Sequence, residues 1–127
     1  MGNEIDLLAK YPKAKRDLTQ RLESKTEEVR SVARKFDKEF FDGERKFGYG
    51  GFSYNSKYWS EVVKDFSNYY NLSDDSKILD VGCAKGFMLY DFYKLNSNFD
   101  LHGIDISKYA IENSVPEIKK KLQVANV

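Results

Sequence analysis

Two kinds of apolar spacing divide this 127-residue chain near its middle. From Tyr11 to Lys35, apolar residues recur at intervals of three, four and seven among many charged residues, which predicts an amphipathic helix after Pro12. Acidic and basic residues interleave here, so we expect the apolar face to cover a sheet or pair with another chain rather than to seek a membrane. A second helical pattern follows, with core positions at Trp59, Val62, Val63, Phe66 and Tyr70.

The segment from Phe36 to Tyr70, which includes the second helical pattern, is dense in aromatic residues, and several glycines lie in its first part, up to Tyr54. Glycine permits the positive backbone angles of tight chain reversals, so this first part is predicted to be a loop. Its aromatic side chains have two interpretations. Either the loop covers a ligand, or the rings fill a core between the first helix and the sheet.

After residue 76 the pattern changes to short apolar strands. Lys77–Gly86 reads K-I-L-D-V-G-C-A-K-G, in which an apolar run suited to a strand buried on both faces leads into a glycine turn. Phe87–Leu95 has helical spacing, and His102–Ile106 is predicted to be the next strand. Leu122–Val127 is predicted to be a third strand and the start of a loop. The order strand, helix, strand predicts a parallel sheet.

The chemistry of the turn depends on the residues around its glycines. A dinucleotide-binding turn has the pattern G-x-G-x-x-G, whereas this turn reads G-x-A-x-G, with Ala84 in the middle and Asp80 directly before it. A carboxylate at that place repels a pyrophosphate and attracts an ammonium or a sulfonium group. S-adenosylmethionine carries both cationic groups, so the charge favours this ligand over NAD.

A second acid ends the next predicted strand. Asp105 follows the turn by a little over ~20 residues, a spacing at which an acid hydrogen-bonds the ribose hydroxyls of a nucleotide. Asp105 and Ser107 also suit the cap of a helix that begins at Lys108. The capping role and the ribose-binding role are compatible with each other.

These residues resemble the class I S-adenosylmethionine-dependent methyltransferases, whose first motif reads acid-x-G-x-G-x-G and whose second strand ends in an acid. The resemblance implies that Asp80 faces the methionine end of the cofactor, that Asp105 binds the ribose and that Ile106 packs on the adenine. Ala84 stands where the family usually has glycine, and Asn126 is the candidate for a polar contact with the adenine. The candidate cofactor-binding residues are Asp80, Gly82, Cys83, Ala84, Gly86, Asp105, Ile106 and Asn126.

By the same resemblance, residues ahead of the first motif form a lid over the cofactor and the acceptor. The stretch K-F-G-Y-G-G-F-S-Y at positions 46–54 is similar to that of bacterial members that modify small or surface-carbohydrate substrates. The candidate lid or substrate residues are Arg45, Tyr49, Gly50 and Tyr54. The implied function is transfer of a methyl group to a small-molecule or carbohydrate acceptor, and no side chain stands out as its general base.

Two other functions stay open at this point. One is a non-catalytic Rossmann-like module that serves binding or assembly, and the other is a fragment of an NAD-dependent oxidoreductase, which Ala84 and Asp80 disfavour. Cys83 is not expected to be a nucleophile, because Ala84 fills the middle of the turn, where a nucleophile elbow places its reactive residue. His102 is the single histidine and has no nearby metal-binding partners in the sequence, so we expect a structural role and no metal site.

The predicted fold is α/β, a Rossmann-like parallel sheet with flanking helices that is incomplete at about three strands and is preceded by the amphipathic helix. Residues 1–71 are expected to form the helical and lid segment, and residues 72–127 the first part of the S-adenosylmethionine-binding domain. The family's sheet normally continues through further strands. An incomplete sheet leaves an apolar face and an edge open, which predicts self-association, a partner chain that completes the sheet, or a chain that is part of a longer protein.

Composition adds exclusions to this picture. A net charge of +1, with 41% hydrophobic and 32% charged residues, describes a soluble globular chain without the basic excess of a nucleic-acid-binding protein. A single cysteine excludes an intramolecular disulfide framework. The sequence has no apolar run typical of a membrane span or a signal peptide, and we therefore expect a cytoplasmic protein.

Overall fold

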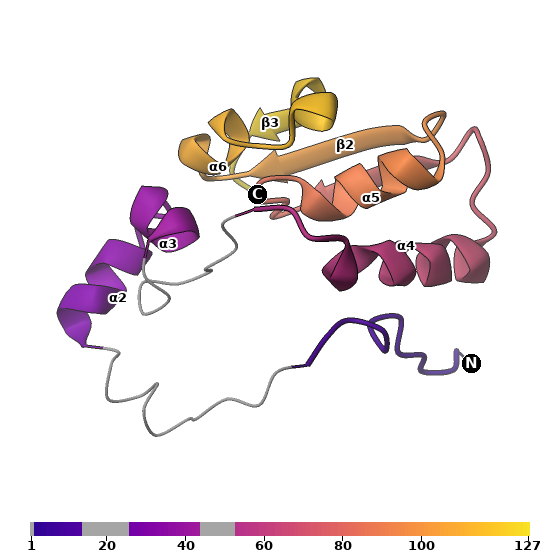
Figure 1. The fold of residues 1–127 in the computed structure, drawn as a ribbon, viewed down its shortest axis with the longest axis horizontal. Helices are drawn as coiled ribbons and strands as arrows, with labels where there is room; N and C mark the ends of the chain where they lie inside the picture. The colour runs from indigo at the N-terminus through magenta and orange to yellow at the C-terminus, as the bar shows by residue number, and fades with distance from the viewer. Residues whose placement is uncertain (1, 14–25, 44–52) are drawn as a thin grey trace.

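The computed structural model of the chain describes residues 2–13, 26–43 and 53–127. Its centre is a three-stranded parallel sheet in the order β1 (Lys77–Val81), β2 (Asp100–Asp105) and β3 (Leu122–Val124) (Figure 1). Because all three strands are parallel, their carboxyl ends meet at the same edge of the sheet. The arrangement confirms the predicted α/β class with an incomplete Rossmann-like sheet.

Helices connect the strands and cover the sheet. α5 (Phe87–Leu95) links β1 to β2 and has the bounds that its apolar spacing predicted. α6 (Lys108–Glu112) and the 3-10 helix η2 (Pro116–Lys121) link β2 to β3. α4 (Ser56–Tyr70) packs on α5 and confirms that the second pattern is helical. The prediction that Tyr70 is a core position is wrong, because this last residue of the helix is 57% exposed. Within the three described ranges, no helix is long and apolar enough to cross a membrane.

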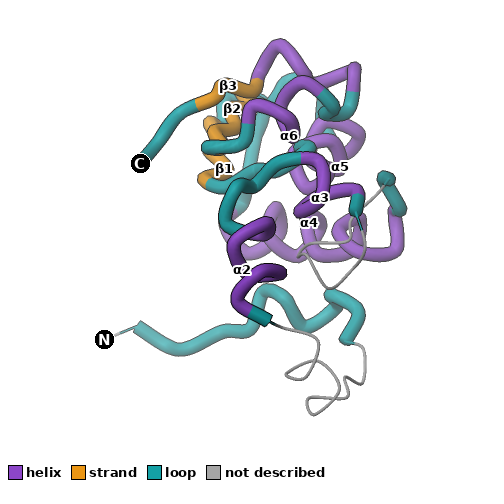
Figure 2. The backbone as a smooth tube through the Cα atoms, turned by 90° about the vertical axis from the view of Figure 1, so that its left-hand side faces the viewer, coloured by secondary structure: helices purple, strands orange, loops and turns teal. Residues whose placement is uncertain are grey.

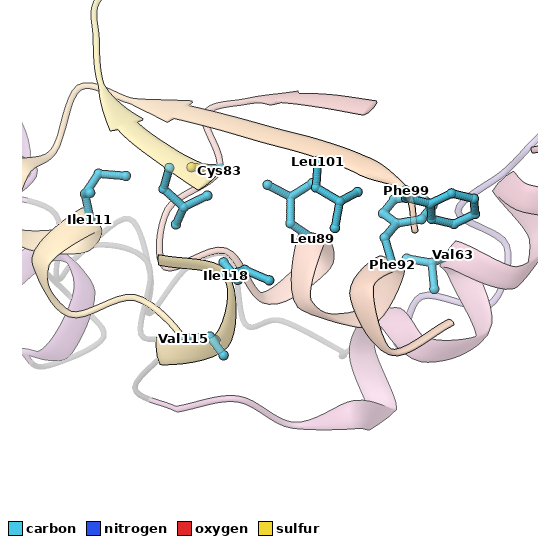
Figure 3. Close-up of a cluster of buried hydrophobic side chains, with 10 residues drawn as sticks. Val63, Cys83, Leu89, Phe92, Phe99, Leu101, Ile111, Val115 and Ile118 are labelled. Atoms are coloured by element: carbon cyan, nitrogen blue, oxygen red, sulfur yellow. The ribbon is translucent and has the colours of Figure 1, made fainter. Parts of the chain in front are cut away.

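The hydrophobic core lies between the sheet and these helices (Figure 3). Leu89 of α5, Leu101 of β2 and Ile118 of η2 are at most 1% exposed, so the central strand and both connections contribute to one shared core. Full burial of such a side chain stabilises the fold by about 1.5–3 kcal/mol. The buried members of this core are Val63, Cys83, Leu89, Phe92, Phe99, Leu101, Ile111, Val115, Ile118 and Leu122.

The amino-terminal part contributes two short helices, α2 (Glu27–Ala33) and α3 (Lys38–Asp42), and α3 packs beside α6 (Figure 1). The side chain of Thr26 caps α2 by accepting a hydrogen bond from the amide of Val29 at 3.2 Å. Residues 11–13 are not helical, and residues 14–25 lie outside the described residues. The structure therefore confirms the first predicted helix only within α2.

The predicted loop from Phe36 onward is wrong for its first residues, because they contain α3. The side chain of Asp37 caps this helix by accepting from the amide of Lys38 at 2.9 Å, and Phe41 is only 3% exposed. Gly43, which counted toward the loop pattern, follows the last helical residue and ends the helix. Residues 44–52 of the predicted loop lie outside the described residues.

The prediction that β1 is buried on both faces is also wrong. Leu79 and Val81 point to one side of the sheet and are 60% and 55% exposed, and Val124 of β3 is 45% exposed. Figure 2 shows α4, α5 and α6 together on one side of the three strands. A parallel sheet is buried on both faces only where helices cover both, and the described helices that pack on this sheet cover one. The expected self-association or partner chain stays a prediction.

Two glycines of the turn after β1 allow a matched test of the packing. Gly86 has a φ of +82°, and a Cβ there would lie 2.4 Å from Cδ1 of the fully buried Ile118. Gly82 has a φ of +79°, but a Cβ added there would have no neighbouring atom within 4 Å. Gly82→Ala should lower the free energy of unfolding by about 1 kcal/mol through backbone strain alone. Gly86→Ala should lower it by about 2–4 kcal/mol, because strain and overpacking add.

Urea unfolding of the two variants measures this difference. Equal losses of stability in both variants would contradict the described packing of Gly86 against η2.

Candidate functional site

A cavity of about 390 Å³ lies at the edge of the sheet where the strands end. Its volume falls in the range of about 300–1,000 Å³ that is typical of small-molecule sites. Its lining comes from the ends of β1 and β2 and the residues just after them, from the residues after β3, and from Phe36 and α3 in the amino-terminal part. The lining residues are Phe36, Phe40, Phe41, Val81, Gly82, Ala84, Ile104, Asp105, Ile106, Ala125, Asn126 and Val127.

The turn between β1 and α5 is tight because three of its residues have left-handed backbone angles. Gly82 and Gly86 have φ of +79° and +82°, and Ala84 has φ of +52° although it carries a side chain. The amides of Gly82 and Cys83 both donate to the carbonyl of Ile104, at 2.8 and 3.0 Å. The turn is thereby attached to the end of β2.

Asp105 connects the turn to the start of α6. Its Oδ2 accepts a hydrogen bond from the amide of Ala84 and its Oδ1 accepts one from the amide of Ser107, each at 2.8 Å. The helix cap itself is Ser107, whose Oγ accepts from the amide of Ala110 at 3.1 Å. The predicted capping role is therefore confirmed for Ser107, and Asp105 braces the turn while it also lines the cavity.

Asp80 is half-buried near the same edge of the sheet, where it pairs in register with Gly103. Burial raises the pKa of its carboxyl group to about 6, and the charge of Asp105 adds to this shift. The raised pKa means that the folded protein holds the ionised group at a cost in free energy. A cation placed near Asp80 would reduce that cost.

The structure distributes the other predicted site residues as follows. Gly82, Ala84, Asp105, Ile106 and Asn126 line the cavity, whereas Asp80, Cys83 and Gly86 do not. Cys83 is 5% exposed, and burial raises the pKa of its thiol to about 12, so it stays neutral.

The predicted lid residues Arg45, Tyr49 and Gly50 lie outside the described residues. Tyr54 does not line the cavity, and its hydroxyl donates to Oδ1 of the buried Asp91 at 2.5 Å and accepts from Nζ of Lys94 at 2.5 Å. Tyr54 therefore connects the residues before α4 to α5.

Sequence analysis missed the aromatic residues Phe36, Phe40 and Phe41 as cavity residues. All three belong to the aromatic segment, for which covering a ligand is one of two interpretations, but none of them is named there as a site residue. The only local signal is the F-x-x-x-F-F spacing, which places these rings on a short stretch of chain. Their approach to the strands depends on contacts with residues more than 40 positions later, and no local pattern encodes such contacts.

The raised pKa of Asp80 predicts how stability depends on pH. Above pH ~6 the folded protein carries an ionised, half-buried carboxylate, so Asp80→Asn should raise the free energy of unfolding at pH 7 by about 1–3 kcal/mol. As the pH falls from about 6 to about 4, the wild type takes up this proton in the folded state and gains the same stability. The difference between variant and wild type should then disappear.

Urea unfolding at both pH values measures this effect, with Asp75→Asn at an exposed position as the control. A variant that is no more stable than the wild type at pH 7 would contradict the burial of Asp80.

Comparison with known proteins agrees with this geometry. Residues 72–127 match the family model of a methyltransferase domain. No curated protein sequence matches the chain. The matched range contains β1, β2, β3 and the turn that Asp105 braces. Residues 72–127 are thus similar to a methyltransferase domain, which is consistent with the class I S-adenosylmethionine-dependent methyltransferases that the sequence resembles.

Proposed function

We propose that this chain is the S-adenosylmethionine-binding portion of a methyltransferase that acts on a small-molecule or carbohydrate acceptor. The observation that carries the proposal is the cavity at the carboxyl ends of the strands, next to two acids. In open parallel sheets, ligands bind at this edge. Methyltransferase domains of the matched kind generally bind S-adenosylmethionine, which supports the same ligand here.

The residues of the cavity fit an adenosyl ligand. Each carboxylate oxygen of Asp105 accepts a hydrogen bond from one backbone amide and keeps a second lone pair. Both oxygens can therefore still accept hydrogen bonds from ribose hydroxyls. Ile106 lines the cavity next to Asp105 and is 55% exposed, so an adenine ring can pack on it. Asn126 supplies a side-chain amide that can donate a hydrogen bond to the adenine or accept one from it. At Gly82 the space that a Cβ would occupy is open, so a ligand can approach the backbone there.

The charge of the site selects among nucleotide-type ligands. Asp80 is half-buried and its pKa is raised. The carboxylate of Asp105 lies close enough to contribute to that shift. Two carboxylates disfavour the pyrophosphate of NAD and favour a cationic ligand. The sulfonium and ammonium groups of S-adenosylmethionine meet this requirement, and a nicotinamide dinucleotide does not.

S-adenosylmethionine, when bound, supplies the methyl group that passes to a nucleophile of the acceptor. The residues described here bind and orient the cofactor, and the apolar lining of the cavity keeps water away from it. Asp105 is the only acidic or basic side chain among the described lining residues, and two backbone amides already engage it. Asp105 is therefore a binding group rather than the general base.

The acceptor class rests on the resemblance of the stretch at 46–54 to that of bacterial enzymes with small or carbohydrate substrates. Two of the candidate acceptor residues, Tyr49 and Gly50, belong to that stretch, and Arg45 directly precedes it. Tyr54, the last residue of that stretch, is held on α5 by Asp91 and Lys94.

An isosteric change at Asp80 tests the proposed charge recognition. Asp80→Asn keeps the shape of the side chain and removes its charge, so the affinity for S-adenosylmethionine should fall about 5- to 30-fold, or about 1–2 kcal/mol. S-adenosylhomocysteine has the amino group but lacks the sulfonium. If Asp80→Asn loses less affinity for this ligand than for S-adenosylmethionine, Asp80 lies near the sulfur rather than near the amine. Isothermal titration calorimetry of both proteins measures the four dissociation constants.

NAD serves as the negative control in these titrations and should bind to neither protein. Tight NAD binding, or wild type without affinity for either adenosyl ligand, would contradict the proposed function.

The same carboxylate predicts the pH dependence of binding. The ligand's cation favours ionised Asp80, whose pKa in the free protein is about 6, so affinity should be full above this pH and fall below it. Between pH 7 and pH 5 the dissociation constant of the wild type should rise about 3- to 10-fold, since one proton must be released on binding. Asp80→Asn has no such proton, and its affinity should change little over this range.

A further inference from the structure

Three aromatic side chains outside the matched domain line the cavity described above. Phe36 and Phe40 pack edge to face with ring centroids 5.0 Å apart, and Phe40 and Phe41 do the same at 4.9 Å. Phe41 is 3% exposed and Phe36 is 39% exposed, so the row runs from the core to the surface. We call these three residues the aromatic wall.

Both ends of the aromatic wall are fastened to the cofactor-binding domain. At one end, the hydroxyl of Ser107 donates to the backbone carbonyl of Phe36. At the other, the carboxylate of Asp42 accepts from Nζ of Lys85 and from the hydroxyl of Tyr109. Ser107 and Tyr109 belong to the start of α6, and Lys85 belongs to the turn before α5. The wall is thus attached to the two elements that Asp105 braces.

The attachments are built into the fold rather than placed on its surface. The Lys85 side chain is 5% exposed and that of Asp42 is 21% exposed. Burial alone would raise the pKa of Asp42, but the hydrogen bonds from Lys85 and Tyr109 outweigh it and hold the pKa below its ordinary value. Asp42 is therefore ionised at neutral pH, and each of its two carboxylate oxygens accepts a hydrogen bond.

The backbone of Phe36 shows that its position is constrained. Its φ of +47° lies in the left-handed region, which a phenylalanine rarely adopts. Such angles persist where surrounding contacts hold them, and they cluster at ligand sites. The bond from Ser107 to the Phe36 carbonyl is a contact of this kind, and it holds the ring at the cavity.

We propose that the aromatic wall contacts the flat face of the ligand's purine base, and that Asp42 and Ser107 are positioning residues that hold the wall in place. This inference rests on the proposed function. The polar groups of the cavity, Asp105 and Asn126, come from the strand ends, and the wall supplies an apolar aromatic side. An aromatic ring is the side chain on which a purine stacks, independently of the ligand's methionine end.

Binding of two ligands distinguishes contacts with the purine base from contacts with the methionine end of the cofactor. S-adenosylhomocysteine and 5′-methylthioadenosine share the adenosyl group, and only the first carries the amino acid. Phe40→Leu removes the ring and keeps an apolar side chain, so both ligands should lose affinity by the same factor, about 5- to 50-fold. Phe36→Leu, at a more exposed position that tolerates change, repeats the test should Phe40→Leu fail to fold.

Phe66→Leu is the matched control, because Phe66 packs on Phe92 and does not line the cavity. It should lower stability without changing either dissociation constant. A wild type that binds S-adenosylhomocysteine while Phe40→Leu and Phe36→Leu bind it equally well would overturn the aromatic wall and leave the proposed function standing. A wild type that binds neither ligand would overturn both.

The positioning role of Asp42 has a spectroscopic readout. In a Trp59→Phe chain, Phe40→Trp places the single tryptophan in the wall, and saturating 5′-methylthioadenosine should quench its fluorescence. Adding Asp42→Asn should weaken binding about 3- to 10-fold and reduce the quenching at saturation, with an unchanged far-ultraviolet circular dichroism spectrum. Quenching that is equal with and without Asp42→Asn would show that Asp42 does not position the wall.

Discussion

The carboxylate of Asp105 is the contact on which the architecture of the site depends. One oxygen holds the amide of Ala84 in the turn after β1, and the other holds the amide of Ser107 at the start of α6. Ser107 in turn binds the carbonyl of Phe36. Three segments of the chain that are far apart in sequence thereby meet at one cavity. The two hydrogen bonds to the Asp105 carboxylate are charge-assisted, and such bonds are stronger than neutral ones.

Backbone strain and electrostatic cost gather around this cavity. Phe36 and Ala84 both have left-handed backbone angles despite their side chains, and both line it. Asp80 nearby carries a raised pKa. Strained angles and shifted pKa values cost stability, and their concentration at one edge of the sheet is typical of a site that binds a ligand. The well-packed core around Leu89 and Ile118 lies beneath it and offsets that cost.

The elements that could be predicted from the sequence are those whose sequence signals lie within a short stretch of the chain. The apolar run, the glycines and the helical spacing of Lys77–Leu95 lie next to each other, and α5 has the predicted bounds. The turn glycines and Asp105 were recognised for the same reason. The parallel pairing of the strands was predictable from the connections, because a helix between two strands favours parallel pairing.

The features that sequence analysis missed are held by distant contacts. α3 has only five residues, too few to be stable alone, and it is fastened through Asp42 to Lys85 and Tyr109. The exposed face of β1 depends on what covers the sheet, which the apolar run of β1 does not encode. The double engagement of Asp105 was equally hidden, since an acid at a strand end suits ribose binding and bracing alike.

The most direct test of this account is a titration of the isotopically labelled chain with S-adenosylhomocysteine, followed by backbone amide NMR. We expect the largest shifts at cavity-lining residues of each contributing segment, namely Gly82, Ala84, Ile106, Asn126 and Phe40. Amides on the outer face of α4 should stay unchanged. Shifts confined to other surfaces, or a spectrum unchanged at saturating ligand, would contradict the assignment of this cavity as the cofactor site.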